Sequence, residues 1–175
     1  MILTRNLVVA LIATVIAFST LYIPQPMLPL LAEQFGVSPG EAGLLMTLAM
    51  LPLAVAPVLY GYFLQAIPAR LMLKVALSLL ALNQVCFIFA DEFWHLLALR
   101  LMQGFLLPAI FTALMTYCAS MVAPAQVRRA MGYYIGATII GGFIGRLVGG
   151  VFASSFDWHS AFLVMGLMQL VPLFL

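Results

Sequence analysis

The stretch GYYIGATIIGGFIGRLVGG, residues 132–150, decides the fold of this chain. It is apolar enough to cross a membrane as a helix, and glycine recurs through it at helical spacing. One stripe at intervals of four residues holds Gly141, Gly145 and Gly149. The adjoining stripe holds Gly142, Arg146 and Gly150. Side chains this small let a second helix approach closely, so the stretch predicts a tight helix–helix contact that can also slide or rock.

Hydrophobic residues make up 66% of the 175 residues, and charged residues only 7%. A water-soluble domain of this size could not tolerate that composition on its surface. One crossing needs about 20 apolar residues, which predicts an all-α, polytopic membrane bundle of six helices. They are expected near residues 6–30, 42–66, 70–90, 94–122, 130–153 and 160–175. The sixth ends without a polar flank, so we read residues 1–175 as the front part of a longer protein.

Basic and acidic residues alternate between the connections that join these helices. The basic connections hold Arg5, Arg70, Lys74, Arg128 and Arg129. The acidic connections hold Glu33, Glu41, Asp91, Glu92 and Asp157. Because lysine and arginine are retained on the cytoplasmic side during insertion, the N-terminus is predicted to be cytoplasmic. Trp94 and Trp158 fall at the opposite boundary, where we expect both rings at headgroup level.

The same composition argues against several classes of function. A formal charge of +2 without a basic run gives no basis for nucleic-acid binding. Cys86 and Cys118 are too scattered for a metal site, and neither a metal nor a cofactor is expected. The sequence offers no acid–histidine, serine–histidine or cysteine–histidine pair at one membrane depth, which argues against an intramembrane enzyme. The connections are short, so the protein is expected to act within the bilayer.

Two arginines break the sorting of charges, because Arg100 and Arg146 lie inside apolar blocks. Arg100 lies about 12 Å inward from Glu92, and Arg146 about 16 Å inward from Asp157, at the helical rise. A cation near the bilayer centre costs several kcal/mol unless it is satisfied, so both should face the bundle interior or a wet cavity. Each could clamp carbonyls of neighbouring helices. Alternatively, Arg100 could meet substrate or take part in proton coupling, together with Gln103 one turn away.

No aspartate or glutamate lies within a predicted membrane segment. If the protein exchanges protons for a cationic solute, it needs an intramembrane carboxylate. Either that acid lies outside residues 1–175, or the solute is neutral or anionic and pairs with arginine. Among uncharged polar residues, Gln25 is the best candidate for a cavity, because Pro24 and Pro26 open the helix around it.

Several of these residues resemble motifs of the major facilitator superfamily. The spacing of Gly132, Gly141, Gly145, Gly149 and Gly150 is similar to the antiporter motif of its fifth helix. Its fourth-helix motif, an arginine before a Gln-Gly pair, is matched by Arg100, Gln103 and Gly104. Its signature between the second and third helices resembles Gly61 and Arg70. The resemblance implies an inverted 3+3 repeat of helices, and Gln25-Pro26 through Pro29 is also similar to Gln103 through Pro108.

The chain departs from the family pattern at two places. Arg146 stands where the antiporter motif usually has proline, so no kink is forced there and a cation enters a small-residue interface. A subgroup of bacterial efflux-type members looks similar at this position. In the loop before the third helix, Gln65, Ala66 and Pro68 replace the usual acid, base and glycine. That replacement weakens the expectation of the charge clasp that usually helps to hold the inner gate.

The resemblance implies that residues 1–175 are the N-terminal transmembrane half of a secondary active transporter. Such a transporter of a small solute, of the efflux type, would work by alternating access against a second six-helix half. It would lie in the bacterial inner membrane. Substrate contact is expected from Gln25, Arg100 and Gln103. Gating and packing are expected from Gly61, Arg70, Gly104, Gly132, Gly141, Gly145, Arg146, Gly149 and Gly150. The alternatives are a half-size transporter that acts as a dimer and a membrane scaffold subunit that transports nothing.

Overall fold

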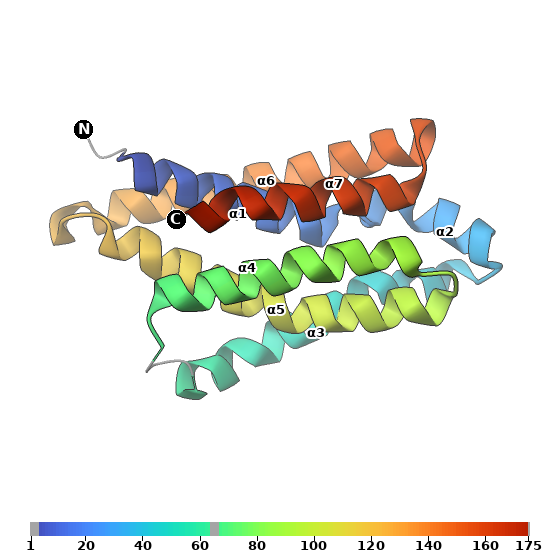
Figure 1. The fold of residues 1–175 in the computed structure, drawn as a ribbon, viewed down its shortest axis with the longest axis horizontal. Coiled ribbons are helices and arrows are strands. Elements are labelled where there is room, and N and C mark those ends of the chain that lie inside the picture. The colour runs from blue at the N-terminus through green and yellow to red at the C-terminus, as the bar shows by residue number, and fades with distance from the viewer. Residues whose placement is uncertain (1–3, 64–66, 175) are drawn as a thin grey trace.

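The computed structural model describes residues 4–63 and 67–174, and every regular element in them is a helix. The long helices are α1 (Arg5–Tyr22), α3 (Pro39–Phe63), α4 (Ala69–Cys86), α5 (Phe93–Ser120) and α6 (Val127–Ser155). The shorter ones are α2 (Leu28–Phe35) and α7 (Trp158–Leu170). They run side by side along one axis (Figure 1). Five of the resulting segments are long and apolar enough to cross a membrane, which confirms the prediction of an all-α membrane bundle.

The first predicted helix, residues 6–30, is interrupted in the structure. Helix α1 ends at Tyr22, a 3-10 turn covers Gln25–Met27, and α2 then continues to Phe35. Pro24 and Pro26 lack the backbone N–H groups that a continuous helix would use here, which explains the break. Helix α2 ends at Gly36, whose φ of 63° is left-handed and favours glycine.

The other helices lie close to their predicted positions. The predicted ranges 42–66, 70–90, 94–122 and 130–153 correspond to α3, α4, α5 and α6, and 160–175 corresponds to α7. Short 3-10 turns flank three of these helices, at Phe87–Phe89, Pro124–Gln126 and Val171–Phe174. Helix α3 starts at Pro39 because Ser38 and Glu41 form a reciprocal cap, in which each backbone N–H donates to the other side chain.

The closest helix pairs are α1 with α6 and α3 with α5, and α4 packs on both α5 and α7. If the first three membrane segments exchange places with the last three, the pair α1–α6 becomes the pair α5–α3. The pairing therefore has the symmetry that an inverted repeat of three helices requires.

The pair α1–α6 is a contact of backbone against backbone. A Cβ atom added at Gly141 would lie 2.6 Å from the carbonyl oxygen of Val15. Cβ atoms at Gly145 and Gly149 would come even closer to the backbone of α1, one and two turns further along. Ser19 Oγ also donates to the carbonyl of Gly141 at 3.0 Å. The C-terminal half of α1 therefore lies along the glycine stripe.

Gly104 serves the pair α3–α5 in the same way. A Cβ atom there would lie 2.7 Å from the carbonyl oxygen of Ala49 and 2.9 Å from that of Leu48. Both closest helix pairs thus depend on the absence of a side chain.

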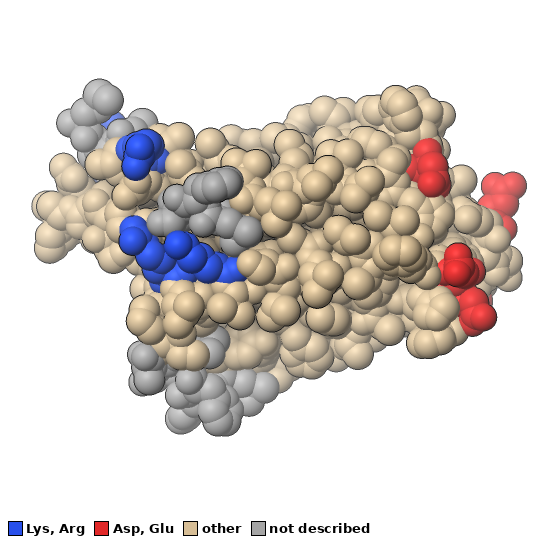
Figure 2. Space-filling model, viewed as in Figure 1, with Lys and Arg blue, Asp and Glu red and all other residues tan. Residues whose placement is uncertain are grey.

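Opposite charges lie at opposite ends of the bundle. On the face that Figure 2 shows, lysine and arginine gather at one end and aspartate and glutamate at the other. The long apolar surface between them carries neither. This is the distribution expected for a body that crosses a bilayer with one face in each compartment.

The prediction that both tryptophan rings lie at headgroup level is wrong for Trp158, which protein covers, whereas Trp94 lies at the surface of the bundle. The side chain of Trp94 is 59% exposed, whereas that of Trp158 is only 2% exposed. The indole Nε1 of Trp158 donates to Gln34 Oε1 at 2.7 Å, and its ring packs edge-on against Phe35. Because Gln34 and Phe35 belong to α2, the segment beyond the break in α1 covers this ring.

We expect Gly145→Ala to destabilise the bundle, because its methyl group would push the backbones of α1 and α6 apart. The cost should be about 1–3 kcal/mol, which is typical of overpacking. Gly136→Ala on the same helix is the matched control, since a Cβ atom there meets nothing within 4 Å. Thermal unfolding in detergent should show a lower midpoint for the first variant only. Equal midpoints for the two variants would contradict the backbone contact.

Candidate functional site

The guanidinium of Arg100 is completely buried where three helices meet. It extends from α5, and its Nε donates to the carbonyl of Leu45 on α3 at 2.8 Å. Its Nη2 donates to the carbonyl of Leu21 on α1 at 3.1 Å, and its Nη1 donates to Gln103 Oε1. Every nitrogen of the group thus has an acceptor. This is the arrangement of a clamp, in which a buried cation is satisfied by carbonyls of neighbouring helices.

The hydrogen bonds continue from Arg100 into a fourth helix. Gln103 is also fully buried, and its Nε2 donates to Gln84 Oε1 on α4 at 3.1 Å. Nearby, Asn83 Nδ2 donates to the carbonyl of Leu99 at 3.2 Å. Among the described residues, Gln84 Nε2 and Asn83 Oδ1 find no partner. The polar chain Arg100–Gln103–Gln84 therefore ties α1, α3, α4 and α5 together inside an apolar bundle.

A second buried tie joins α7 to α1, and the sequence analysis overlooked it. Gln169 Nε2 donates to Thr20 Oγ1 at 2.8 Å, and both side chains are fully buried. The available signal was an amide residue inside an apolar stretch, the same feature that marked Gln25.

Arg146 lies in a different environment, because its side chain is exposed on the surface of this bundle. Its Nε donates to Gln25 Oε1 at 2.8 Å, and its Nη1 donates to the carbonyl of Gly142 at 3.0 Å. Its guanidinium carbon lies 4.1 Å from the centroid of the Tyr22 ring, which is a cation–π contact. A Cβ atom at Gly142 would lie 3.4 Å from that ring, so glycine leaves the ring space to lie against α6.

Arg146 borders a hollow of about 290 Å³ between α1 and α6. The hollow is lined by Phe18, Tyr22, Thr138, Ile139, Gly142 and Arg146. Its walls are aromatic and aliphatic, and the guanidinium provides the charge. Phe18 and Thr138 carry no signal in the sequence that marks them as cavity residues.

The structure divides the three residues predicted to contact substrate between two places. Arg100 and Gln103 lie together in the buried network, whereas Gln25 lies beside Arg146 at the hollow. Both places meet the end of α1: Arg100 binds the carbonyl of Leu21, and Arg146 contacts Tyr22 and Gln25. The segment just before the proline break is thus held from two sides by two arginines.

The residues predicted for gating differ in their surroundings. A Cβ atom at Gly132 would meet nothing within 4 Å, and one at Gly150 would meet only Pro26, at 4.0 Å. Arg70 Nη2 donates to the hydroxyl of Tyr117 at 3.3 Å, at the basic end of the bundle. The surroundings of Gly61 lie outside the described residues, as do Gln65 and Ala66 altogether.

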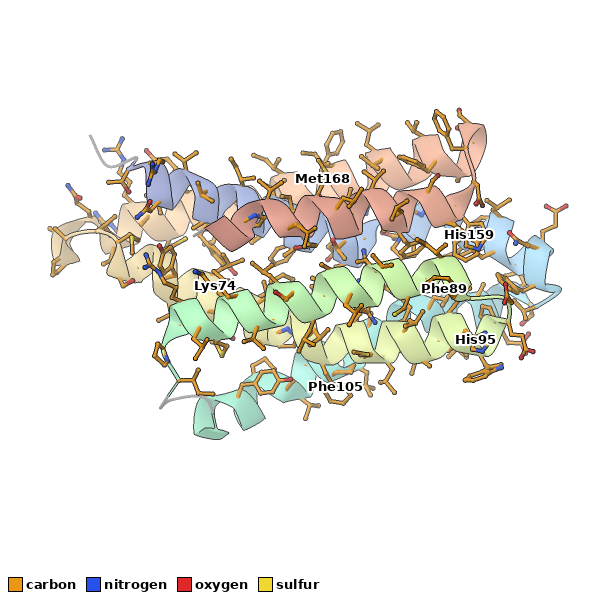
Figure 3. All side chains as sticks on the ribbon, viewed as in Figure 1. Lys74, Phe89, His95, Phe105, His159 and Met168 are labelled. Atoms are coloured by element: carbon orange, nitrogen blue, oxygen red, sulfur yellow. The ribbon has the colours of Figure 1, made fainter. Side chains whose placement is uncertain are left out.

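The two histidines lie at the acidic end of the bundle, where α5 and α7 begin, far along the axis from Lys74 (Figure 3). His159 Nδ1 lies 2.8 Å from a carboxylate oxygen of Asp157 at the surface. Within residues 4–63 and 67–174, no three histidine, cysteine or acidic side chains gather as a metal site would require. The charged group at the hollow is the guanidinium of Arg146. A guanidinium is suited to binding a ligand rather than to acting as an acid, base or nucleophile.

A bundle of apolar helices with charges sorted to its ends is an integral, multi-pass membrane protein. The sequence model of the Major Facilitator Superfamily matches residues 10–175, so the chain belongs to that superfamily. The resemblance inferred from its motifs is thereby confirmed.

The chain is similar to several bacterial transport proteins. It is 32% identical over 156 residues to inner membrane transport protein YnfM of Escherichia coli K12, covering 87% of this chain and 37% of that protein. It is 30% identical over 156 residues to the uncharacterized MFS-type transporter YybF of Bacillus subtilis, covering 88% and 38%. It is 28% identical over 170 residues to a multi-drug resistance efflux pump PmrA homolog of Lactococcus lactis, covering 93% and 41%.

The chain thus spans about two fifths of the length of these relatives. Family and relatives point to a transporter rather than an enzyme.

We expect Arg100→Ala to lower the stability of the bundle more than Gln84→Leu does. The first change removes the charged donor from the carbonyls of Leu21 and Leu45 and leaves the buried Oε1 of Gln103 unpaired, and each such loss costs about 1–3 kcal/mol. The second removes one acceptor but also removes the unpaired Nε2 of Gln84, so its cost should be smaller. Thermal unfolding in detergent measures both. Similar losses for the two variants would show that Arg100 is not the centre of the network.

Proposed function

We propose that this chain forms part of a secondary active transporter of a small solute, which works by alternating access in the bacterial inner membrane. The observation that carries the proposal is the exposed guanidinium of Arg146, about 16 Å inward from the charged outer end of α6. A cation at that depth cannot face lipid without a large cost. The surface formed by α1 and α6 must therefore meet water or protein.

A second helical half is the proposed neighbour of this surface. Helices α3 and α6 are the least buried of the long spans, so the bundle has broad unpacked faces on two of its helices. The relatives are more than twice as long as their aligned parts. In the proposed mechanism the two halves rock against each other, and the hollow beside Arg146 opens between them to either side of the membrane.

The residues then take distinct roles. Gln25 and Arg146 contact the solute, because both border the surface that the second half would face. Arg100 and Gln103 hold α1 in place behind that surface, since neither is exposed. The stripe of Gly141, Gly145 and Gly149 provides the smooth contact along which α1 and α6 keep their packing during rocking.

Outward transport is the proposed direction, with the basic end of the bundle and the N-terminus in the cytoplasm. The positive-inside rule supports the orientation. The name of the Lactococcus lactis relative, an efflux pump, supports the direction.

The proposed orientation predicts opposite labelling of two introduced cysteines. In a variant in which Cys86 and Cys118 are replaced by serine, Ser38→Cys should react with a membrane-impermeant maleimide in intact cells. Ala125→Cys should react only after the cells are made permeable. Both positions are exposed at connections between helices. Labelling of both cysteines from the same side would contradict the proposed crossing pattern.

Transport itself is tested in cells that express the complete gene product. Mass spectrometry of cells and medium should show that at least one small solute is several-fold less abundant in cells with the protein than in cells without it. A compound that collapses the membrane potential should abolish this difference. Gln25→Ala should abolish it as well, whereas Arg128→Gln, an exposed charge at the cytoplasmic end, should not. If no solute differs between cells with and without the protein, the scaffold alternative is favoured. Depletion by residues 1–175 alone would favour the half-size dimer.

A further inference from the structure

We propose that the hollow beside Arg146 binds the carboxylate, or an equivalent anionic group, of a small organic solute, with Arg146 as its counter-charge. This inference rests on the proposed transport function and deepens it by naming the class of substrate. The site uses the surface between α1 and α6 and leaves the buried network around Arg100 undisturbed.

The guanidinium of Arg146 is already fixed for such a contact. Gln25 Oε1 and the carbonyl of Gly142 each accept one of its hydrogen bonds, and the ring of Tyr22 supports its flat face. The remaining nitrogen, Nη2, donates to no acceptor among the described residues. A planar guanidinium held in this way loses little freedom when an anion binds, and its remaining Nη2 can donate charge-assisted hydrogen bonds to a carboxylate.

The walls of the hollow suit the apolar body of an organic anion. Phe18 and Ile139 supply aromatic and aliphatic surface beside the charged group. The hydroxyl of Thr138 donates its hydrogen to the carbonyl of Ile135 at 2.7 Å, so Arg146 remains the main hydrogen-bond donor for a ligand in the hollow. A volume of about 290 Å³ holds a small ring or a short chain.

The distribution of charge selects an anion over a cation. The five acidic residues of the chain all lie at helix ends or in connections, and none lies at the depth of Arg146. On the face that Figure 2 shows, acidic side chains gather at one end of the bundle. A cationic solute would meet only a like charge here. An anion would offset the cost of keeping a guanidinium at this depth. A phospholipid headgroup is a poor source of that anion, because headgroups lie about 16 Å further out, near Asp157.

Binding is tested with benzoate, and with benzamide as a neutral molecule of the same shape. Saturation-transfer difference NMR on the purified full-length protein should show benzoate bound at least tenfold more tightly than benzamide. Arg146→Gln should raise the dissociation constant of benzoate at least tenfold, whereas Arg128→Gln should leave it unchanged. Thr138→Phe fills the hollow without changing a charge, so it should weaken benzoate binding even if Arg146→Gln fails to fold.

Equal binding of benzoate and benzamide would overturn the proposal, as would full benzoate affinity in Thr138→Phe or in a folded Arg146→Gln variant. The same holds if benzoate does not bind at all, for instance because an acidic residue of the second half occupies Arg146. These outcomes are separate from solute depletion in cells. A protein that depletes a solute but does not bind benzoate through Arg146 is a transporter with a different substrate class.

Discussion

Helices α1 and α6 touch backbone to backbone, and the positions of the polar groups around Arg146 depend on that contact. Because Gly141, Gly145 and Gly149 carry no side chain, the C-terminal half of α1 lies directly along α6. Tyr22 and Gln25 then arrive beside Arg146, and the hollow forms between the two helices. A larger residue in the stripe would separate the helices and remove these contacts together.

The two intramembrane arginines solve the same electrostatic problem in different ways. Arg100 is satisfied entirely inside the bundle, so its charge stabilises the meeting point of α1, α3 and α5 and is closed to ligands. Arg146 is held by α1 and by its own helix, and the rest of its surface stays accessible. In a medium of low dielectric, each guanidinium N–H without an acceptor costs free energy. A buried arginine therefore pairs all its N–H groups within the protein, whereas an arginine at the bundle surface can pair the remaining ones with a ligand.

The features that depend on local composition could be predicted from the sequence. The contacts that depend on the path of the chain after α1 could not. Hydropathy located the membrane helices, and the spacing of glycines identified the face of α6 that α1 covers. Intramembrane burial of Arg100 followed from the cost of a cation in lipid. The pairing of Gln25 with Arg146, rather than with Arg100, could not be predicted, because it depends on where the break at Pro24 leaves the chain. Trp158 was misjudged for the same reason, since α2 covers it only after that break.

Arginine in place of the usual proline leaves α6 as one uninterrupted helix from Val127 to Ser155. Its hydrogen-bond ladder contains no missing donor at that position, so α6 resists bending there. Helix α1, interrupted at Pro24 and Pro26, is the weaker element of the pair. Bending of this pair during a change of conformation is therefore easiest at the proline break that follows α1, where Arg146 holds Gln25. In this pair of helices the flexible point thus lies at the break after α1 and not within α6.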